Sequence, residues 1–484
     1  MPAAYEIGPW ATCVARVVDA AAFLAYAHAV ATASLPDDSD VDRHPLDRLE
    51  RGLSLTDATM LCVSSVIGVG IFLTPGTVAN VLPHPGLVLT AWFIGGLLSL
   101  AGALANAELG AMYPRAGGDY VYLSEAYHPL AGFLVGWLSF FVIYAGTVAT
   151  LAAGFAEGLA HFIDLGTVAK TTVAVGITLV TSWINYAGVR AGAQFNNVTG
   201  YIKIVALLGL AVAGPLFGRG TLANLSPLLG GTSGVPLSGL GLALSPILFS
   251  YLGWNASVYV ASEIRDPGRN VPRSLFVGLA MCTAIYLLIN AVYLYALPIE
   301  RLRGEVRVGE AAARALFGAA GGTLTATLVL ASIVGCLNAT ILVGPRIAYA
   351  MALDGFFFSG VHRVHERHRT PHVAIGVQAV TAIALIVVLQ SFPSVLDYTT
   401  FAIVLATMAD TTALYALRRR YPARARPYRA WGYPMVPALY FVANAGIATA
   451  MLLGRPKECL IALAVSATGV PFYLRFARRT AATG

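Results

Sequence analysis

The stretch SSVIGVGIF at residues 64–72 decides the fold, because it places Gly68 and Gly70 in the middle of a long apolar run. The run extends from about residue 53 to residue 80, which is enough for one helix to cross a bilayer. Each glycine disfavours a helix by about 1 kcal/mol relative to alanine, so the helix is expected to loosen here. Lipid cannot satisfy the freed backbone groups, so the break must line a cavity inside the protein, where the N-terminal end of the outer half-helix can bind a carboxylate. Alternatively, the two glycines only let neighbouring helices approach closely.

The composition of the chain indicates an all-α polytopic membrane protein. Of its 484 residues, 57% are hydrophobic and only 11% are charged, whereas charged residues make up about 25% of a soluble domain. Five scattered cysteines form neither a metal-binding spacing nor a disulfide framework. Apolar runs of about 20 residues recur, as expected of spanning helices. Twelve transmembrane helices are predicted, near residues 54–80, 86–112, 129–157, 168–187, 194–218, 238–263, 273–297, 321–352, 372–390, 394–417, 434–454 and 457–476.

The distribution of basic residues predicts the orientation of the chain. With the N-terminus in the cytoplasm, 21 of the 31 Lys and Arg residues fall in cytoplasmic segments and 8 in external ones. This positive-inside asymmetry places both termini in the cytoplasm of a multi-pass protein of the cell (inner) membrane. Topology thereby explains the net charge of +7, so the lipid bilayer is an expected partner and nucleic acid is not.

A second interruption lies in the sixth predicted span, in the stretch FSYLGWN at residues 249–255. Polar Ser250 and Asn255 flank Gly253 there, at mid-depth. The first and sixth spans take corresponding places in two five-helix halves, and paired glycine-interrupted spans point to a transporter's binding site at the middle of the membrane. The pairing favours a substrate site between these two spans over close packing alone.

Several motifs, in the same order along the chain, resemble the amino acid–polyamine–organocation (APC) superfamily, nearest its L-type and bacterial amino acid permeases. VSSVIGVGIFLTPG (63–76) looks like the first helix of that superfamily, and FSYLGWNASVYVASEIRDPGRNVPRSL (249–275) looks like the sixth helix and the loop after it. GALANAELGAMYPRAGGDYVYLSEAY (102–127), NYAGVRAGAQFNNVTGYIKI (185–204) and YRAWGYP (428–434) are also similar. The resemblance implies a five-plus-five inverted repeat (LeuT-like) with two peripheral helices, and alternating access around a site between helices 1 and 6.

The expected organisation follows from these boundaries. A cytoplasmic N-terminal extension, either disordered or a surface helix, precedes a transporter core, a basic linker, the last two helices and a short tail. These parts are residues 1–52, 53–417 (repeat 1 about 53–218, repeat 2 about 238–417), 418–433, 434–476 and 477–484.

The resemblance also implies the roles of the residues at the two interruptions. The N–H groups at positions 68–70 would bind a substrate carboxylate, and carbonyl groups near Val66, Phe249 and Leu252 would take its ammonium group. Phe249 would close over the site as an aromatic lid. Val69 stands where many relatives have Ser or Thr, so backbone donors must suffice. The expected substrate-binding residues are Val66, Gly68, Val69, Gly70, Ile71, Phe249, Leu252, Gly253, Trp254 and Asn255.

Lys203 is one of only three lysines and lies near the middle of the fifth span. A charge at that depth is costly and marks a functional site unless the side chain snorkels to an interface. In the superfamily, the residue at this position resembles a built-in replacement for a sodium ion that bridges helices 1, 5 and 8. Ser332, Cys336 and Asn338 of the eighth span are its candidate partners, and the lysine is expected to take part in coupling.

These observations predict a secondary transporter of amino acids that is independent of sodium and is driven by proton coupling or exchange. A polyamine or organic-cation carrier and a transporter-like amino acid sensor are the alternatives. No catalytic motif and no paired carboxylates within the spans are found in the sequence, so no enzyme and no cofactor are expected. The three histidines at 362–368 fit a solvated basic loop better than a metal site, and Arg346 is expected to snorkel. The loop at 157–170 has no cysteine, so a disulfide-linked partner is not expected.

Overall fold

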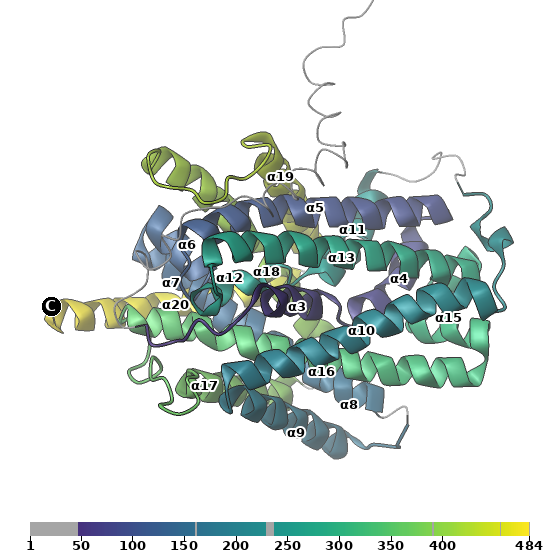
Figure 1. The fold of residues 1–484 in the computed structure, drawn as a ribbon, viewed down its shortest axis with the longest axis horizontal. Coiled ribbons are helices and arrows are strands. Elements are labelled where there is room, and N and C mark those ends of the chain that lie inside the picture. The colour runs from purple at the N-terminus through teal and green to yellow at the C-terminus, as the bar shows by residue number, and fades with distance from the viewer. Residues whose placement is uncertain (1–46, 160–161, 229–236, 390–391, 455, 484) are drawn as a thin grey trace, which may run out of the picture.

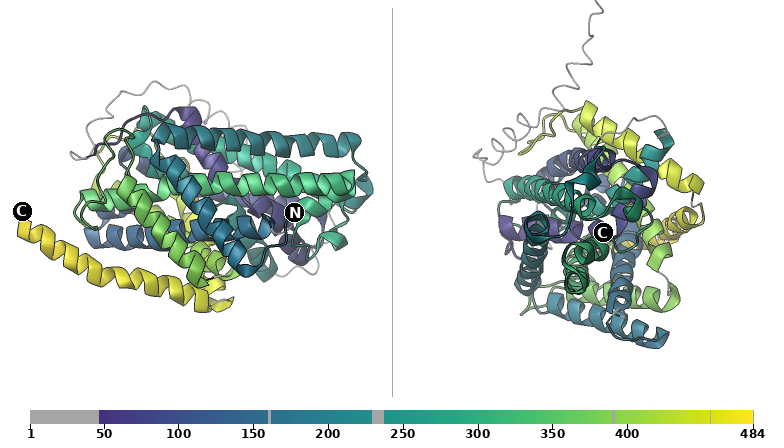
Figure 2. Two further views of the ribbon diagram at one scale, coloured as in Figure 1. Left: turned by 90° about the horizontal axis from the view of Figure 1, so that it is seen from below. Right: turned by 90° about the vertical axis from the view of Figure 1, so that its right-hand side faces the viewer.

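The computed structural model describes residues 47–159, 162–228, 237–389, 392–454 and 456–483, and every named element in these ranges is a helix. The long helices run side by side and form one bundle, which Figure 2 also shows end-on. The unbroken long helices are α5 (Pro85–Met112), α9 (Thr167–Tyr186), α10 (Val189–Phe217), α13 (Pro267–Ala296), α16 (Ala319–Leu353), α17 (His372–Leu389), α18 (Phe392–Arg420), α19 (Met435–Gly454) and α20 (Pro456–Thr483).

The apolar helices show that this is a multi-pass membrane protein. Within the described ranges, nine helices are long and apolar enough to cross a membrane, and a bent pair of shorter helices would make a tenth. The expected span near 238–263 is interrupted, and the apolar part of α17, His372–Val387, is shorter than the others. The total of twelve spans and the inverted repeat therefore stay predictions.

Two helices are broken near their middles, as the glycine-containing stretches predict. α3 (Leu55–Val66) and α4 (Gly70–Val81) meet at a bend of 43°. α11 (Leu237–Tyr251) is followed by the single turn α12 (Ala256–Tyr259) and by η3 (Ala261–Glu263). α3 packs against α10, α13 and α16, and α4 packs against α11 and α15 (Val308–Phe317) (Figure 1).

The third expected span consists of three consecutive pieces, α7 (Pro129–Leu138), the π-helical η1 (Ser139–Tyr144) and α8 (Ala145–Leu159). Shorter helices occupy the connections between the long ones. They are α6 (Asp119–Ala126), η2 (Leu222–Leu225), α14 (Ile299–Leu302) and α15 (Val308–Phe317).

The chain joins the bundle at its first described residues. Residues 1–46 of the expected N-terminal extension lie outside the described residues. Leu49 is buried against Ala116 and Tyr349, and the Tyr349 hydroxyl donates to Asp47 Oδ1 at 2.9 Å. Leu53 forms a β-bridge with Ile264, which ties the start of α3 to the end of η3.

One end of the bundle, here called the charged end, holds two buried ion-paired groups. Glu263 accepts a forked pair of hydrogen bonds from Arg346, at 2.7 Å to Nε and 3.1 Å to one terminal nitrogen, and both side chains are fully buried. Glu108 is likewise buried and pairs with Arg418 and Arg426. The expectation that Arg346 snorkels is wrong, because η3 brings a carboxylate directly to its guanidinium group.

Candidate substrate site

The first break leaves backbone donors without helical partners. Gly68 N–H turns back to Val66 O at 2.8 Å, and the amides of Phe72 and Leu73 both donate to Val69 O. No acceptor is found for the amides of Val69 and Gly70 among the backbone groups that the structure describes. Because α4 begins at Gly70, these amides are at a helix N-terminus, where an anionic group is favoured.

The second break packs directly against the first. Gly253 has φ +96°, and a Cβ placed on it would lie 2.7 Å from Ser65 Cβ and 3.0 Å from Ser65 O. A Cβ on Gly70 would lie 2.5 Å from Ser250 Oγ and 2.8 Å from Ser250 Cα. The glycines therefore serve both roles considered for them, since they interrupt the helices and also let the two interruptions touch.

Tyr286 of α13 holds the two breaks together. Its buried hydroxyl lies 2.8 Å from Val66 O, at the end of α3, and 2.9 Å from Ser250 O, near the end of α11. One hydroxyl thus reaches carbonyl groups that both interrupted helices leave free. The sequence analysis missed this tyrosine, because nothing in an apolar helix shows which side chain will meet a distant break.

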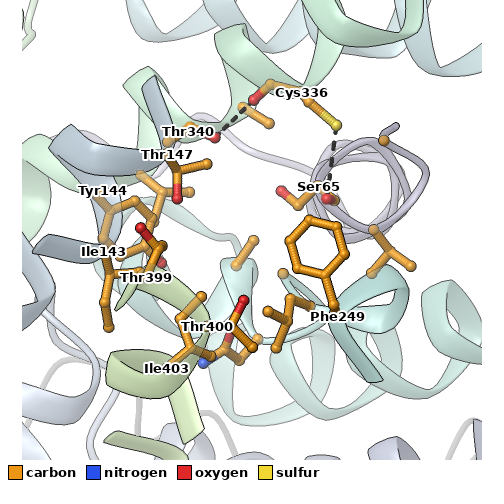
Figure 3. Close-up of a pocket in the computed structure, with 18 of the residues that line it drawn as sticks. Ser65, Ile143, Tyr144, Thr147, Phe249, Cys336, Thr340, Thr399, Thr400 and Ile403 are labelled. Carbon is orange, nitrogen blue, oxygen red and sulfur yellow. Dashed lines mark hydrogen bonds between the residues drawn. The ribbon is translucent and has the colours of Figure 1, made fainter. Parts of the chain in front are cut away.

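A cavity opens beside the two breaks, enclosed by α16, α18 and the third span (Figure 3). Its volume is about 130 Å³, and since one water needs only about 10–15 Å³ on this measure, a small solute fits. Ser65 and Phe249 lie on one side of it, and Tyr144 and Thr147 lie on the opposite side. Hydroxyl groups recur on its walls, from Thr147, Thr150, Thr340, Thr399, Thr400 and Thr407.

Most of the expected substrate-binding residues line this cavity. The eight that do are Val66, Gly68, Val69, Gly70, Phe249, Leu252, Gly253 and Asn255. Ile71 does not, because it lies on the side of α4 that packs into the core. Trp254 lines a smaller neighbouring cavity together with Phe249 and Tyr440. Whether any of these residues binds substrate stays a prediction.

The π-helical segment η1 contributes residues that the sequence analysis did not include. Ile143 and Tyr144 come from it, and both line the cavity. π-helical turns within α-helices are frequent at functional sites, because the extra residue changes which side chains face inward. The run SFFVIYAG (139–146) carries no periodicity that could have revealed this turn.

Lys203 lies at the back of the first break and is 3% exposed. Its ammonium group donates to Ile67 O at 2.8 Å and to Ser64 O at 3.0 Å, and it lies 3.5 Å from Cys336 Sγ. Ser332 donates to the same Ile67 carbonyl at 3.0 Å. The lysine therefore sits at the C-terminal end of α3, where the helix dipole favours a cation.

Of the three candidate partners in α16, only Cys336 contacts the lysine directly. Asn338 instead donates to Gly192 O at 3.0 Å and accepts, through its Oδ1, from Asn185 Nδ2 at 2.8 Å. Cys336 also donates to Ser64 O at 2.8 Å, so its thiol and the lysine share one carbonyl group. Lys203 thus links α10 to the end of α3 and to α16.

The structure also contains a buried pair of carboxyl groups, which the sequence analysis did not identify because it considered paired carboxylates only within the spans. Asp119 of α6 lines the cavity and lies next to Asp410 of α18, and neither is more than 1% exposed. The two residues are 291 positions apart, and Asp119 comes from a connecting segment rather than a span. Only the packing of α6 against α18 brings them together.

Comparison with known proteins agrees with this arrangement. Residues 53–472 match the family model described as amino acid permease. The chain is 30% identical over 443 residues to the serine/threonine exchanger SteT of Bacillus subtilis (strain 168), which covers 90% of this chain and 98% of that protein. It is 27% identical to the human Asc-type amino acid transporter 1, over 88% of this chain and 82% of the relative. The human large neutral amino acids transporter small subunit 2 is also 27% identical, over 88% and 80%.

The chain therefore belongs to the amino acid permease family of the APC superfamily. Members of this family are transporters and not enzymes.

Proposed function

We propose that this protein is a secondary transporter that moves neutral amino acids across the cell membrane by alternating access. The observation that carries the proposal is the meeting of two broken helices at one cavity, with free backbone groups from the first break beside it. The relatives named above are transporters or exchangers of amino acids, which supports the same substrate class.

The carboxylate and ammonium groups of an amino acid each meet backbone groups of opposite partial charge at this site. The amides of Val69 and Gly70 favour the carboxylate, because they begin α4 and have no helical acceptor. Carbonyl groups at the end of α3 favour the ammonium group, because a helix C-terminus carries partial negative charge. The threonine hydroxyls on the opposite walls offer hydrogen bonds to a small polar side chain.

Lys203 supports transport without sodium. Its ammonium group occupies the place where a cation would neutralise the carbonyl groups of Ser64 and Ile67. A cation supplied by this side chain makes an external one unnecessary there. Coupling then comes from protons or from exchange of one amino acid for another.

The proposed orientation places the charged end in the cytoplasm. The arginine residues of segments 363–369 and 418–429 follow the positive-inside rule in this orientation. The five-plus-five repeat would relate α3 and α4 to α11 and α12, and the cavity would lie near the middle of the membrane.

Binding is tested first, by thermal unfolding of the purified full chain with L-serine and with two truncated analogues. A ligand that binds only the folded state stabilises it by about 2.7 kcal/mol at a hundred times its dissociation constant. We expect serine to raise the melting temperature, and neither ethanolamine, which lacks the carboxylate, nor 3-hydroxypropionate, which lacks the ammonium group, to do so. If no neutral amino acid raises it, the proposal is wrong.

Transport is tested by counterflow in proteoliposomes. Vesicles loaded with unlabelled serine should take up labelled serine, and replacing sodium by choline should leave the rate unchanged. Binding without counterflow would identify a sensor. A linear diamine that binds more tightly than any neutral amino acid would identify a cation carrier, which Asp119 on the cavity wall makes the second candidate.

A further inference from the structure

The carboxyl pair formed by Asp119 and Asp410 is not used by the proposed mechanism. Both side chains are buried, and each has one oxygen atom, Oδ1, that accepts no hydrogen bond from a protein donor. Within the described residues, neither carboxyl group forms an ion pair with a lysine, arginine or histidine. Two negative charges in contact without a cation are strongly unfavourable in a buried site.

The groups that face the pair are neutral hydrogen-bonding side chains. The Tyr259 hydroxyl of α12 donates to Asp119 Oδ2 at 2.6 Å, and Asn106 Nδ2 of α5 donates to Asp410 Oδ2 at 3.2 Å. The remaining titratable neighbours are the phenol groups of Tyr122 on α6, Tyr144 on η1 and Tyr440 on α19. The nearest charged residues along α5 and α18 are Glu108 and Arg418, which pair with each other.

A single proton bound to one of the two carboxyl groups removes the repulsion between them. Two ionised carboxylates are both acceptors and cannot hydrogen-bond to one another, whereas a carboxylic acid can donate to a carboxylate. The short hydrogen bond from Tyr259 stabilises the charged form of Asp119, so Asp410 is the better place for the proton. Burial raises the pKa of Asp119 above its usual range, which also favours retention of a proton by the pair.

The pair is connected to the substrate cavity in two ways. Asp119 itself lines the cavity. In addition, Asn255 at the second break donates to the Tyr259 hydroxyl at 3.3 Å, and that hydroxyl donates to Asp119. A substrate that moves Asn255 would therefore change the hydrogen bonding of the carboxyl pair.

We propose that Asp119 and Asp410 form the proton-binding site of this transporter, with one proton shared between them and carried in each cycle together with the substrate. This inference rests on the proposed transport function. The proton arrives from water in the cavity when the site is open to the outside. It leaves to cytoplasmic water after the conformational change, and no other bond is made or broken.

The position of the pair explains how protonation is linked to opening. Asp119 lies at the start of α6 and Tyr259 at the end of α12, and both line the cavity. With the proton present, the carboxyl contact holds α6 and α12 against α18. When the proton has left to cytoplasmic water, two negative charges remain, and their repulsion keeps the carboxyl groups from resuming this contact without a proton.

The test measures uptake of labelled L-serine into proteoliposomes with the lumen held near neutral pH and the external pH varied. Wild-type uptake should increase as the external pH falls, with a limiting slope of roughly tenfold per pH unit for a one-proton step. Asp410→Asn cannot exchange this proton, so its uptake should be independent of the external pH and should not be accelerated by a pH gradient. The matched control is Asp354→Asn, because Asp354 also accepts from a tyrosine, Tyr120, at 2.5 Å but lies outside the cavity.

A second variant keeps the test decisive if Asp410→Asn does not fold. Tyr259→Phe removes the donor that stabilises ionised Asp119, so the pair should hold its proton more tightly. The midpoint of the pH profile should rise by about one unit, as expected for loss of one hydrogen bond to a charged group. A tyrosine with only a packing role would leave the midpoint unchanged.

The outcomes separate this inference from the proposed function. Absence of wild-type serine counterflow at equal pH on both sides would reject the proposed transport. Normal counterflow, together with wild-type pH profiles for Asp410→Asn and Tyr259→Phe, would reject the proton site alone. Loss of diamine binding in Asp410→Asn would instead assign the pair to an organic cation and would also overturn the proton site.

Discussion

The charged end of the bundle and the substrate cavity differ in how their buried charged groups are paired. At the charged end, Glu263 and Arg346 neutralise each other, and Glu108 is neutralised by Arg418 and Arg426. Around the cavity, Lys203 has carbonyl groups and a thiol for partners. In the part of the chain that the structure describes, no carboxylate pairs with Lys203 and no cation pairs with Asp119 or Asp410. Removal of one member of a buried ion pair is strongly destabilising, whereas a buried charge without a counter-charge requires an ion, a proton or a ligand.

This difference assigns separate tasks to the two regions. A forked ion pair that is fully buried fixes one arrangement, because separating it would expose both charges to an apolar environment. The unpaired groups around the cavity can change protonation or partner at much lower cost. We therefore expect substitutions at the charged end to change stability, and substitutions around the cavity to change transport.

The largest expected effect on stability is that of Arg346→Met. It leaves the buried Glu263 carboxylate without its partner and should lower the free energy of unfolding by about 3–5 kcal/mol. Thermal unfolding of the purified protein measures this, with the exposed Arg265→Met as control, expected within about 0.5 kcal/mol of wild type. The double variant Arg346→Met with Glu263→Gln should recover part of the loss. Equal melting temperatures for Arg346→Met and Arg265→Met would contradict the assignment.

Lys203→Met tests the groups around the cavity, where we expect an effect on transport rather than on stability. It removes charge-assisted hydrogen bonds to Ser64 O and Ile67 O, each worth about 1.5–3 kcal/mol, so the end of α3 loses its link to α10. Serine counterflow should be lost, while the melting temperature should change less than in Arg346→Met. Lys170→Met, which lies at the start of α9, is the matched control and should transport normally. A Lys203→Met protein with the wild-type rate and pH profile would show that this lysine has no part in coupling.

Gly253→Ala tests the contact between the two breaks. Alanine is strained at φ +96°, and its Cβ would lie 2.7 Å from Ser65 Cβ, so a cost of about 1–3 kcal/mol is expected, together with weaker serine binding. Gly209→Ala lies within α10 with open space around it and should be neutral or stabilising by up to about 1 kcal/mol. Serine-dependent thermal shifts distinguish the two variants. The contact is unimportant if both bind serine equally.

The smallest effect is expected for Tyr286→Phe. It removes one hydroxyl that reaches Val66 O and Ser250 O, and a single hydrogen bond of this kind contributes about 1 kcal/mol. The melting temperature should fall slightly, and serine affinity should fall with it because the breaks are held less firmly. The exposed Tyr127→Phe serves as control. An unchanged serine affinity would limit Tyr286 to packing.

Much of this architecture could be predicted from the amino-acid sequence. Apolar runs of the required length predict membrane helices, because backbone groups in lipid must be satisfied within each helix. The glycines at 68, 70 and 253 predict both interruptions, and a lysine within an apolar run predicts a functional charge. These features depend on local composition and on the solvent, so they can be read before any packing is known.

What the sequence could not supply are the contacts between helices. The partner of Lys203 among three candidates, the forked pair of Arg346 with Glu263, and the bridging hydroxyl of Tyr286 all join residues far apart in the chain. Asp119 and Asp410 show this most clearly, since they are 291 positions apart and only the packing of α6 against α18 brings them together. The sequence by itself determined which helices form and where they break, because those choices depend on neighbours along the chain. Only the tertiary structure decided which buried charges find a counter-charge, because that depends on which helix faces meet.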